Sequence, residues 1–244
     1  MDFIPLIRRY GYWLIRGFWK PRYIRPNALF EQMTHVGVLA LPSVAMACMF
    51  MGIVLVMQGA YQLQQVGAID YVADLVGVSM FREIGPLITA VIVIGRSASS
   101  ITAELGTMKV SEEIDALEVM GVDPVRYLVM PRVAAMTIMM PCLTVIGECL
   151  GLFGGALISS FSLGMDPYYY GSRLLQAVFL RDLWSGLIKS LIFGFIVGIL
   201  ACYRGLNVEG GAEGVGRETT NSVVLCLKAM LATNCILTAL FYFF

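Results

Sequence analysis

Five ionisable side chains lie inside long apolar stretches of this chain, where a charge is costly and therefore informative. An ionised group in hydrocarbon costs at least about 2.5 kcal/mol near the centre, so it must pair, face water or reach an interface. Paired, such groups hold helices together; facing water, they gate or line a polar passage. Both roles are open for these side chains, which are Arg96, Glu104, Glu148, Asp182 and Lys189.

Position suggests how some of these charges are arranged. Asp182 and Lys189 are seven residues apart, which places them two helical turns apart on one helix face. Arg96 lies near the middle of its stretch and cannot lose its proton, so it needs a carboxylate. Glu148, at similar depth in the next stretch, is the candidate partner.

The sequence contains no motif that indicates catalysis. In GGAEGVGRETT (210–220), Gly211 and Gly216 have the spacing of a phosphate-binding loop, but Arg217 and Glu218 replace the Lys and Ser/Thr that hold phosphate and Mg²⁺. We expect a flexible loop followed by a helix start. The chain has one histidine and six cysteines, all six within apolar stretches and without CxxC spacing. We therefore expect no enzyme activity, no metal and no cofactor bound by this chain.

Acidic residues crowd one segment, SEEIDALEVMGVDPVRYLVMPR (111–132). Ser111 is predicted to cap a helix whose first turn carries Glu112 and Glu113, and Gly121 to end it in the left-handed conformation. The predicted helix covers about 111–121. Asp123 then caps a second start with Pro124 at its first position, leading through Arg126 into the next apolar stretch.

The predicted helix is amphipathic. Ile114, Ala116, Leu117 and Met120 fall on one side at about 100° per residue, while Glu112, Asp115 and Glu118 fall on the other. A helix of about ten residues buries little by itself, so its apolar face needs a partner surface. That surface is either the remainder of this chain or another subunit.

The composition indicates what surrounds these elements. Mean hydropathy is +0.78, and 14% of the 244 residues are charged. Soluble domains average about 25% charged residues and could not hide several apolar runs of about 20 residues. The chain is therefore predicted to be an all-α polytopic membrane protein. Its formal net charge is zero, and no nucleic-acid partner is expected.

Apolar length predicts five transmembrane helices, the third long enough to tilt or to break near Pro141. With the N-terminus in the cytoplasm, the inner segments hold 11 Lys and Arg residues and the outer segments only Arg82, Arg173 and Arg181. This asymmetry predicts a cytoplasmic N-terminus and a C-terminus on the opposite, periplasmic side. The predicted spans are 36–62, 84–106, 133–163, 183–203 and 221–244.

Residues 1–35 precede the five-helix domain, which is assigned to 36–244. Leu6, Tyr10 and Trp13 share one helical face, while Arg9 and Arg16 share another. This pattern predicts an amphipathic helix lying on the inner leaflet.

Two further patterns concern packing and lipid. Small residues at four-residue spacing predict close helix contacts, as at Gly147 and Gly151, Gly194 and Gly198, and Gly95 and Ser99. In the first span an adaptable apolar wall of helically spaced residues would suit either a lipid or ordinary packing. The wall consists of Val54, Met57, Gln58 and Tyr61.

The run from Arg82 to Arg132, REIGPLITAVIVIGRSASSITAELGTMKVSEEIDALEVMGVDPVRYLVMPR, resembles the signature region of the MlaE (YrbE) permease family, the membrane subunits of MCE-type ABC lipid transporters. The similarity continues through LIKS (187–190) and GVGRETT (214–220), and covers roughly residues 30–244. Arg96, Glu104 and Lys189 match the family pattern, whereas Glu148 does not.

The resemblance implies a homodimeric permease in the bacterial inner membrane that moves phospholipid. It implies an ABC ATPase subunit (MlaF-like) carrying ATP and Mg, an MCE-domain periplasmic protein (MlaD-like), and room for a small STAS-domain protein. It also implies a lipid site between the first spans of two protomers. The helix at 111–121 then becomes the coupling helix that meets the ATPase, with coupling residues Glu112, Glu113, Asp115, Leu117, Glu118, Met120, Gly121, Asp123, Pro124 and Arg126.

A different class of function stays open beside this one. A self-sufficient, ion-coupled secondary transporter of an amphipathic substrate could use Glu104, Glu148 and Arg96 as its relay. An inverted repeat would favour such a carrier, and five spans of unequal length do not show one.

Overall fold

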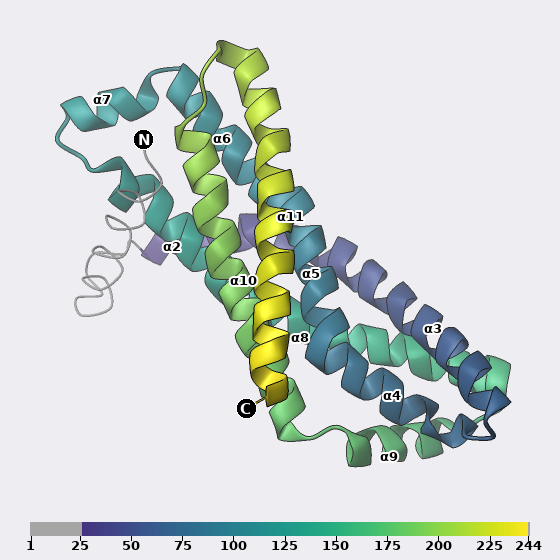
Figure 1. The fold of residues 1–244 in the computed structure, drawn as a ribbon. Helices are drawn as coiled ribbons and strands as arrows, with labels where there is room; N and C mark the ends of the chain where they lie inside the picture. Colours follow the sequence, from purple (N-terminus) through teal and green to yellow (C-terminus); the bar gives the residue numbers. More distant parts are fainter. Residues whose placement is uncertain (1–25, 244) are drawn as a thin grey trace. The chain divides into compact units, whose positions relative to one another are not determined.

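The computed structural model describes residues 26–243, and every regular element within that range is helical (Figure 1). Five helical segments are long and apolar enough to cross a membrane. The predicted all-α, polytopic membrane architecture with five spans is confirmed. The predicted interfacial helix has its face residues within 1–25, outside the described residues, and 26–35 belong to the first described helix.

The spans are built from helices that follow one another with few breaks. The first span consists of α2 (Pro26–Val36), η2 (Val38–Ala40) and α3 (Leu41–Gln65). The second span consists of six consecutive elements: η3 (Ile69–Tyr71), α4 (Val72–Ser79), η4 (Met80–Ile84), α5 (Gly85–Val93), η5 (Ile94–Ala98) and α6 (Ser99–Val110). The third joins η6 (Val125–Val129) and α8 (Met130–Leu163), and the last two are α10 (Leu180–Leu206) and α11 (Gly211–Phe243). Among residues 26–243, two helices lie outside the spans, α7 (Glu113–Val119) and α9 (Pro167–Ala177).

The helices extend beyond the apolar stretches from which they were predicted. The first span begins at Pro26 rather than 36, because an apolar scan registers only the hydrocarbon-facing length. α8 does not break at Pro141, which lies inside a continuous helix. Proline is tolerated in membrane helices, where neighbouring groups satisfy the freed backbone carbonyl.

The glycine-rich stretch 210–220 is not the flexible loop that was predicted. Gly210 and Gly211 have positive φ angles of 93° and 68°, and α11 begins at Gly211 immediately after this turn. The Arg204 guanidinium donates to the Glu218 carboxylate at 3.1 Å. Glycine supplies the turn, and the ion pair fastens the first turns of α11 to α10.

The chain divides into two compact units. Unit 1 contains the described residues 26–40, 93–140 and 191–240. α6, α10 and α11 lie alongside one another in it, and the buried Thr102 hydroxyl lies 3.1 Å from the Ala201 carbonyl oxygen and 2.8 Å from the Ser222 hydroxyl (Figure 1). A Cβ on Gly194 would lie 2.7 Å from the Met136 carbonyl oxygen, so the predicted close packing at this glycine is confirmed.

Unit 2 contains 41–92, 141–190 and the last residues of α11. Gly52 of α3 lies directly against the backbone of Gly151 of α8, which confirms the predicted close packing along α8. α4 packs on α3 and on α9, and Tyr170 of α9 completes a buried apolar cluster with Val56 and Met80. α9 was not predicted. It starts with Asp166 accepting a hydrogen bond from the Tyr168 amide at 3.0 Å and with Pro167 in its first turn.

Candidate functional site

The acidic helix is present but shorter than predicted, because Ser111 does not cap it. The Ser111 hydroxyl lies 2.9 Å from the Thr107 carbonyl oxygen and 3.0 Å from a Glu113 carboxylate oxygen, and Ser111 ends α6. Glu112 occupies the position before α7 with a left-handed φ of 62° and no side-chain cap. The chain therefore turns sharply from α6 into α7.

The C-terminal end of α7 follows the prediction. Gly121 has a φ of 75°, and the amide of Val122 donates to the Leu117 carbonyl at 3.0 Å. Asp123 Oδ1 then accepts a hydrogen bond from the Val125 amide at 2.9 Å, with Pro124 between them. Both the predicted helix stop and the predicted second start are confirmed, and Arg126 is exposed just beyond them.

The apolar side chains of α7 divide between two surroundings. Ile114 is buried within unit 1 and Leu117 is half-buried, whereas Met120 is 68% exposed and the neighbouring Val119 is 88% exposed. The predicted single apolar face is thus wrong in part. A helix of seven residues makes only two turns, so residues near its C-terminus project past the surface on which Ile114 packs. We call Val119 and Met120 the apolar tip of α7.

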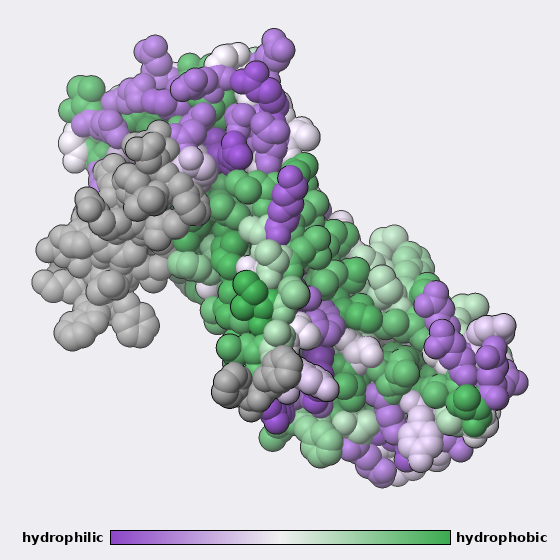
Figure 2. Space-filling model, in the orientation of Figure 1, coloured by the Kyte–Doolittle hydropathy of each residue, from purple (hydrophilic) through white to green (hydrophobic). Residues whose placement is uncertain are grey.

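The acids of this helix face outward, as predicted. Glu112, Glu113, Asp115 and Glu118 are all exposed, and Asp115 accepts a hydrogen bond from Lys109 Nζ at 2.7 Å. Hydrophilic residues gather over α7 and over the neighbouring connection between α10 and α11 (Figure 2). The apolar tip therefore lies within an acidic, water-facing region.

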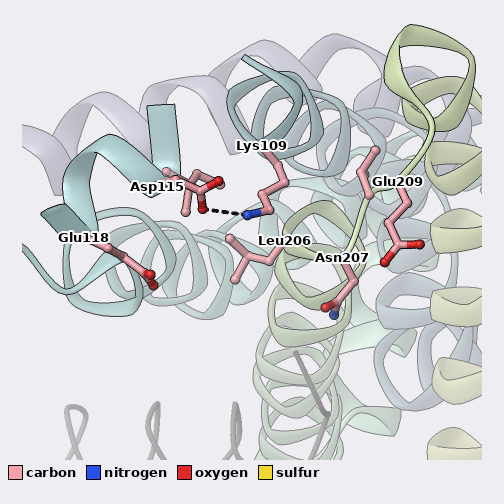
Figure 3. Close-up of a pocket in the computed structure, with 8 residues that line it drawn as sticks. Lys109, Asp115, Glu118, Leu206, Asn207 and Glu209 are labelled. Atoms are coloured by element: carbon pink, nitrogen blue, oxygen red, sulfur yellow. Dashed lines mark hydrogen bonds and ion pairs between the residues drawn. The ribbon is translucent and has the colours of Figure 1, made fainter. Parts of the chain in front are cut away.

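A pocket of about 160 Å³ opens between α7 and the connection from α10 to α11. Figure 3 shows the Lys109–Asp115 ion pair over it, with Glu118 from α7 on one side and Glu209 on the other. Within the part of the chain that the structure describes, the carboxylates of Glu118 and Glu209 make no hydrogen bond or ion pair. The lining residues are Lys109, Ile114, Asp115, Glu118, Leu206, Asn207, Val208 and Glu209.

A polar stripe runs along the second span in unit 1. Arg96, Ser100 and Glu104 follow one another at four-residue spacing, and the Ser100 hydroxyl donates to Glu104 at 3.1 Å. Glu104 also accepts a hydrogen bond from the mostly buried Arg132 guanidinium at 3.2 Å. Arg96 lies in the π-helical turn η5, is exposed, and has no ion-pair partner among residues 26–243.

The expected partnership of Arg96 with Glu148 stays a prediction, because Arg96 belongs to unit 1 and Glu148 to unit 2. Glu148 is buried, and both of its carboxylate oxygens lack a hydrogen-bond partner among the described residues. Sequence depth alone suggested that pair. Similar depth in two helices does not fix the rotational setting of either helix, and rotation decides which side chains meet.

Asp182 and Lys189 are buried in unit 2, and each pairs with a residue of η4 rather than relying on the other. Arg82 Nε donates to Asp182 at 2.5 Å, and Lys189 Nζ pairs with Glu83 and donates to the Arg82 carbonyl at 3.2 Å. Arg82 was predicted to lie in an outer segment, and no role was predicted for Glu83. The adjacent opposite charges of Arg82 and Glu83, just before an apolar run, were the available signal.

The proposed lipid wall lies on the surface of α3. Val54 and Met57 are exposed, as are Gln58 and Tyr61 one turn further on. All four share one helical face by their spacing. Their exposure leaves them free to meet lipid or another protein surface.

The similarity to known proteins covers the part of the chain that contains the five spans. Residues 29–240 match the family model described as Permease MlaE. The chain is 40% identical over 222 residues to a probable ABC transporter permease protein of Rickettsia typhi, covering 91% of this chain and 85% of that protein. It is 33% identical over 245 residues to the intermembrane phospholipid transport system permease protein MlaE of Haemophilus influenzae, covering 99% of this chain and 94% of the relative.

The chain belongs to the MlaE permease family. It is also 32% identical over 212 residues to the chloroplastic Arabidopsis thaliana protein TRIGALACTOSYLDIACYLGLYCEROL 1, of which it covers 61%. Membership identifies this MlaE-family chain as a homologue of ABC transporter permeases, a transporter component rather than a catalyst. No group of three or more His, Cys, Asp or Glu side chains in its described part could hold a metal ion.

Proposed function

We propose that this chain is the permease subunit of an ATP-driven transporter that moves phospholipids between membranes, with ATP hydrolysed on a separate subunit. Its MlaE family membership and the printed function of the Haemophilus relative support phospholipid as the cargo. The observation that carries the coupling step is the apolar tip of α7, two adjacent apolar side chains exposed within an acidic surface.

The apolar tip is the docking element for the ATPase in this proposal. A short helix needs tertiary packing to be stable, and the buried Ile114 and half-buried Leu117 supply it for α7. Val119 and Met120 remain available to a partner. The surrounding carboxylates, with Glu118 and Glu209 at the pocket, favour a partner groove whose floor is apolar and whose rim carries Lys or Arg. ATP and Mg bind to that partner.

The charges that flank the connections between spans support the proposed orientation. Two connections are predicted to face the cytoplasm, 110–125 and 206–211, and the residues beside them carry positive charge, namely Lys109, Arg126, Arg132, Arg204 and Arg217. Positive charges beside a connection favour the cytoplasm for it. The chain would thus sit in the bacterial inner membrane with its N-terminus inside.

In a homodimer, the side chains exposed on the membrane spans would contact the lipid cargo. The wall of Val54, Met57, Gln58 and Tyr61 would hold acyl chains beside the same wall of a second copy. Arg96, exposed in the second span without a partner in the described chain, would bind the phosphate of a headgroup. On the periplasmic side an MCE-domain protein would exchange lipid with the permease, and a small STAS-domain protein would be a further member of the complex.

Purification of the native complex without crosslinking tests the proposal. We expect an ABC ATPase subunit and an MCE-domain protein to co-purify at fixed stoichiometry, and extracted phospholipid to exceed that of a membrane-protein control prepared in parallel. In reconstituted vesicles, lipid transfer should require ATP hydrolysis. Transfer driven by an ion gradient without any ATPase would instead establish the ion-coupled carrier.

A further inference from the structure

Glu148 is a buried ionisable group that the proposed transport function does not use. It lies in α8 within unit 2, is 1% exposed, and its two carboxylate oxygens have no hydrogen-bond partner in the described structure. A Cβ added to Gly85 would lie 2.6 Å from Glu148 Cγ and 3.0 Å from Oε1. The side chain therefore rests on the backbone of α5 at its first residue, where only a glycine leaves room.

The groups around Glu148 are neutral. Gly147, next to it in α8, faces Cys48 of α3 and Thr89 of α5, and the Cys48 thiol lies 4.0 Å from the Thr89 hydroxyl. Neither donates to the carboxyl. The polar groups shown beside Glu148 where α3, α5 and α8 meet are thus a thiol and a hydroxyl, both neutral.

Three cations of unit 2, Arg82, Arg173 and Lys189, are paired with carboxylates other than Glu148, and Arg181 is exposed. α3 carries no charged residue, and neither does α5. In η4, Arg82 pairs with Asp182 and Glu83 pairs with Lys189; in α9, Arg173 pairs with Asp74 at 2.7 Å. α8 itself has no second charged side chain between Pro141 and Leu163.

An ionised carboxylate in this setting would have neither a counter-charge nor a hydrogen-bond donor. Leaving such a charge buried is among the most costly arrangements in a protein, and a carboxyl group avoids it by keeping its proton. Other buried charges of the unit meet the same problem with partners at short distance. Glu148 differs from them because it has no such partner, so it avoids a buried charge by keeping its proton.

We propose that Glu148 is a proton-binding site that ties the packing of α3, α5 and α8 to pH. The packed arrangement holds Glu148 as a neutral carboxylic acid, and any arrangement in which Glu148 reaches water releases the proton. The packed arrangement thus binds one more proton than the opened one. The ratio of opened to packed protein then rises about tenfold per pH unit wherever the opened form is ionised and the packed form is protonated.

Infrared difference spectroscopy of the full chain in lipid nanodiscs tests this directly. We expect the carbonyl stretching band of a protonated carboxylic acid near neutral pH, and its loss in Glu148→Gln. Glu104→Gln is the matched control, because Glu104 is partly exposed and paired with Arg132, so it should leave the band intact. A band unchanged by Glu148→Gln, or absent from the unsubstituted chain, overturns the proposal.

Thermal unfolding against pH supplies a second, independent readout. The sign follows from the proton count: the native form keeps the proton that the unfolded chain releases above about pH 4.3, so stability falls as pH rises. Glu148→Gln should remove this slope while keeping the fold, since the amide is neutral and nearly the same size. Stability that depends on Na⁺ or K⁺ concentration at constant pH would mean that Glu148 binds a metal cation, and would also overturn the proton site. The lipid cargo enters neither measurement, so failure here leaves the proposed transport function standing.

Discussion

Arg82 donates a hydrogen bond from Nε to the Asp182 carboxylate at 2.5 Å, although the two residues are separated by 100 positions in the chain. Their exposures differ sharply: the Asp182 side chain is 1% exposed and that of Arg82 52%. The carboxylate is also held by the Phe179 amide at 3.0 Å. The pair therefore consists of a buried charge and a cation that can be solvated when left alone.

This asymmetry predicts unequal effects of breaking the pair. Arg82→Gln leaves a buried carboxylate without its cation and should destabilise the protein by about 3 kcal/mol. Asp182→Asn leaves an exposed arginine and an amide oxygen that still accepts from Phe179, so the loss should be about 1 kcal/mol. Thermal unfolding in detergent measures both, with the exposed Arg181→Gln as the control. Equal losses would mean that burial does not decide the outcome.

The apolar tip of α7 predicts where the ATPase contact can be broken. Val119→Asp and Met120→Asp should abolish co-purification of the ATPase while leaving the melting temperature unchanged, because both side chains are exposed in the isolated chain. Leu117→Asp should lose the ATPase too, but with reduced stability, since Leu117 is half-buried. Tyr168→Asp on α9 is the control, being 83% exposed outside the spans. Full ATPase recovery with both tip variants would refute the docking role of α7.

Close packing of α3 on α8 predicts a strong effect at one glycine. A Cβ at position 52 would collide with the Gly151 carbonyl, so Gly52→Ala should force the helices apart and cost about 1–3 kcal/mol. The close contact predicted at Gly95 is wrong within the described chain, because a Cβ there meets no atom within 4 Å. Gly95→Ala is therefore the helical control, and alanine should stabilise by up to about 1 kcal/mol. Unfolding midpoints of the two variants compare them, and a Gly52→Ala protein as stable as the parent would contradict the contact.

Removing the hydroxyl of Tyr170 in α9 should make the protein more stable. Its hydroxyl is buried in unit 2 without a hydrogen-bond partner in the described structure, and burial raises the pKa of Tyr170 to about 12. Tyr170→Phe removes that unsatisfied group and should raise stability by about 1 kcal/mol. Between the ordinary pKa of about 10 and a pH of about 12, the unfolded chain ionises first, so the parent loses stability with rising pH. Melting curves across this range should show a steeper decline for the parent than for the phenylalanine variant.

The features that sequence predicted correctly are those fixed by neighbouring residues. The five spans follow from apolar length. The helix stop at Gly121 follows from the ease with which glycine adopts a left-handed φ, and the Asp123 cap follows from the Asp-Pro pair after it. Asp166 and Pro167 form the same local signal at the start of α9, a helix that was not predicted.

The features that failed depend on competition or on distant partners. Ser111 could cap α7 or bond back to α6, and the local sequence does not decide which. The glycines at 210–220 suggested a loop, yet an ion pair to Arg204 fastens that stretch as helix. Arg82 and Asp182 meet across 100 positions, and helix rotation decides such meetings.

Substitution of Arg96 should change the rate of phospholipid transfer without changing the stability of the fold. Its guanidinium stays charged, lies exposed in a span, and has no ion-pair partner in the described part of the chain, so its removal should not loosen the fold. Arg96→Gln is therefore expected to melt like the parent but to transfer phospholipid at least tenfold more slowly with the ATPase present, because an arginine–phosphate contact of about 1.5 kcal/mol or more is lost. Arg96→Lys should recover part of the rate through its charge. Arg132→Gln is the contrasting variant: Arg132 is mostly buried and pairs with Glu104, so its loss should lower the melting temperature. If Arg96→Gln destabilises the chain as much as Arg132→Gln does, or transfers lipid at the parental rate, Arg96 does not contact the headgroup.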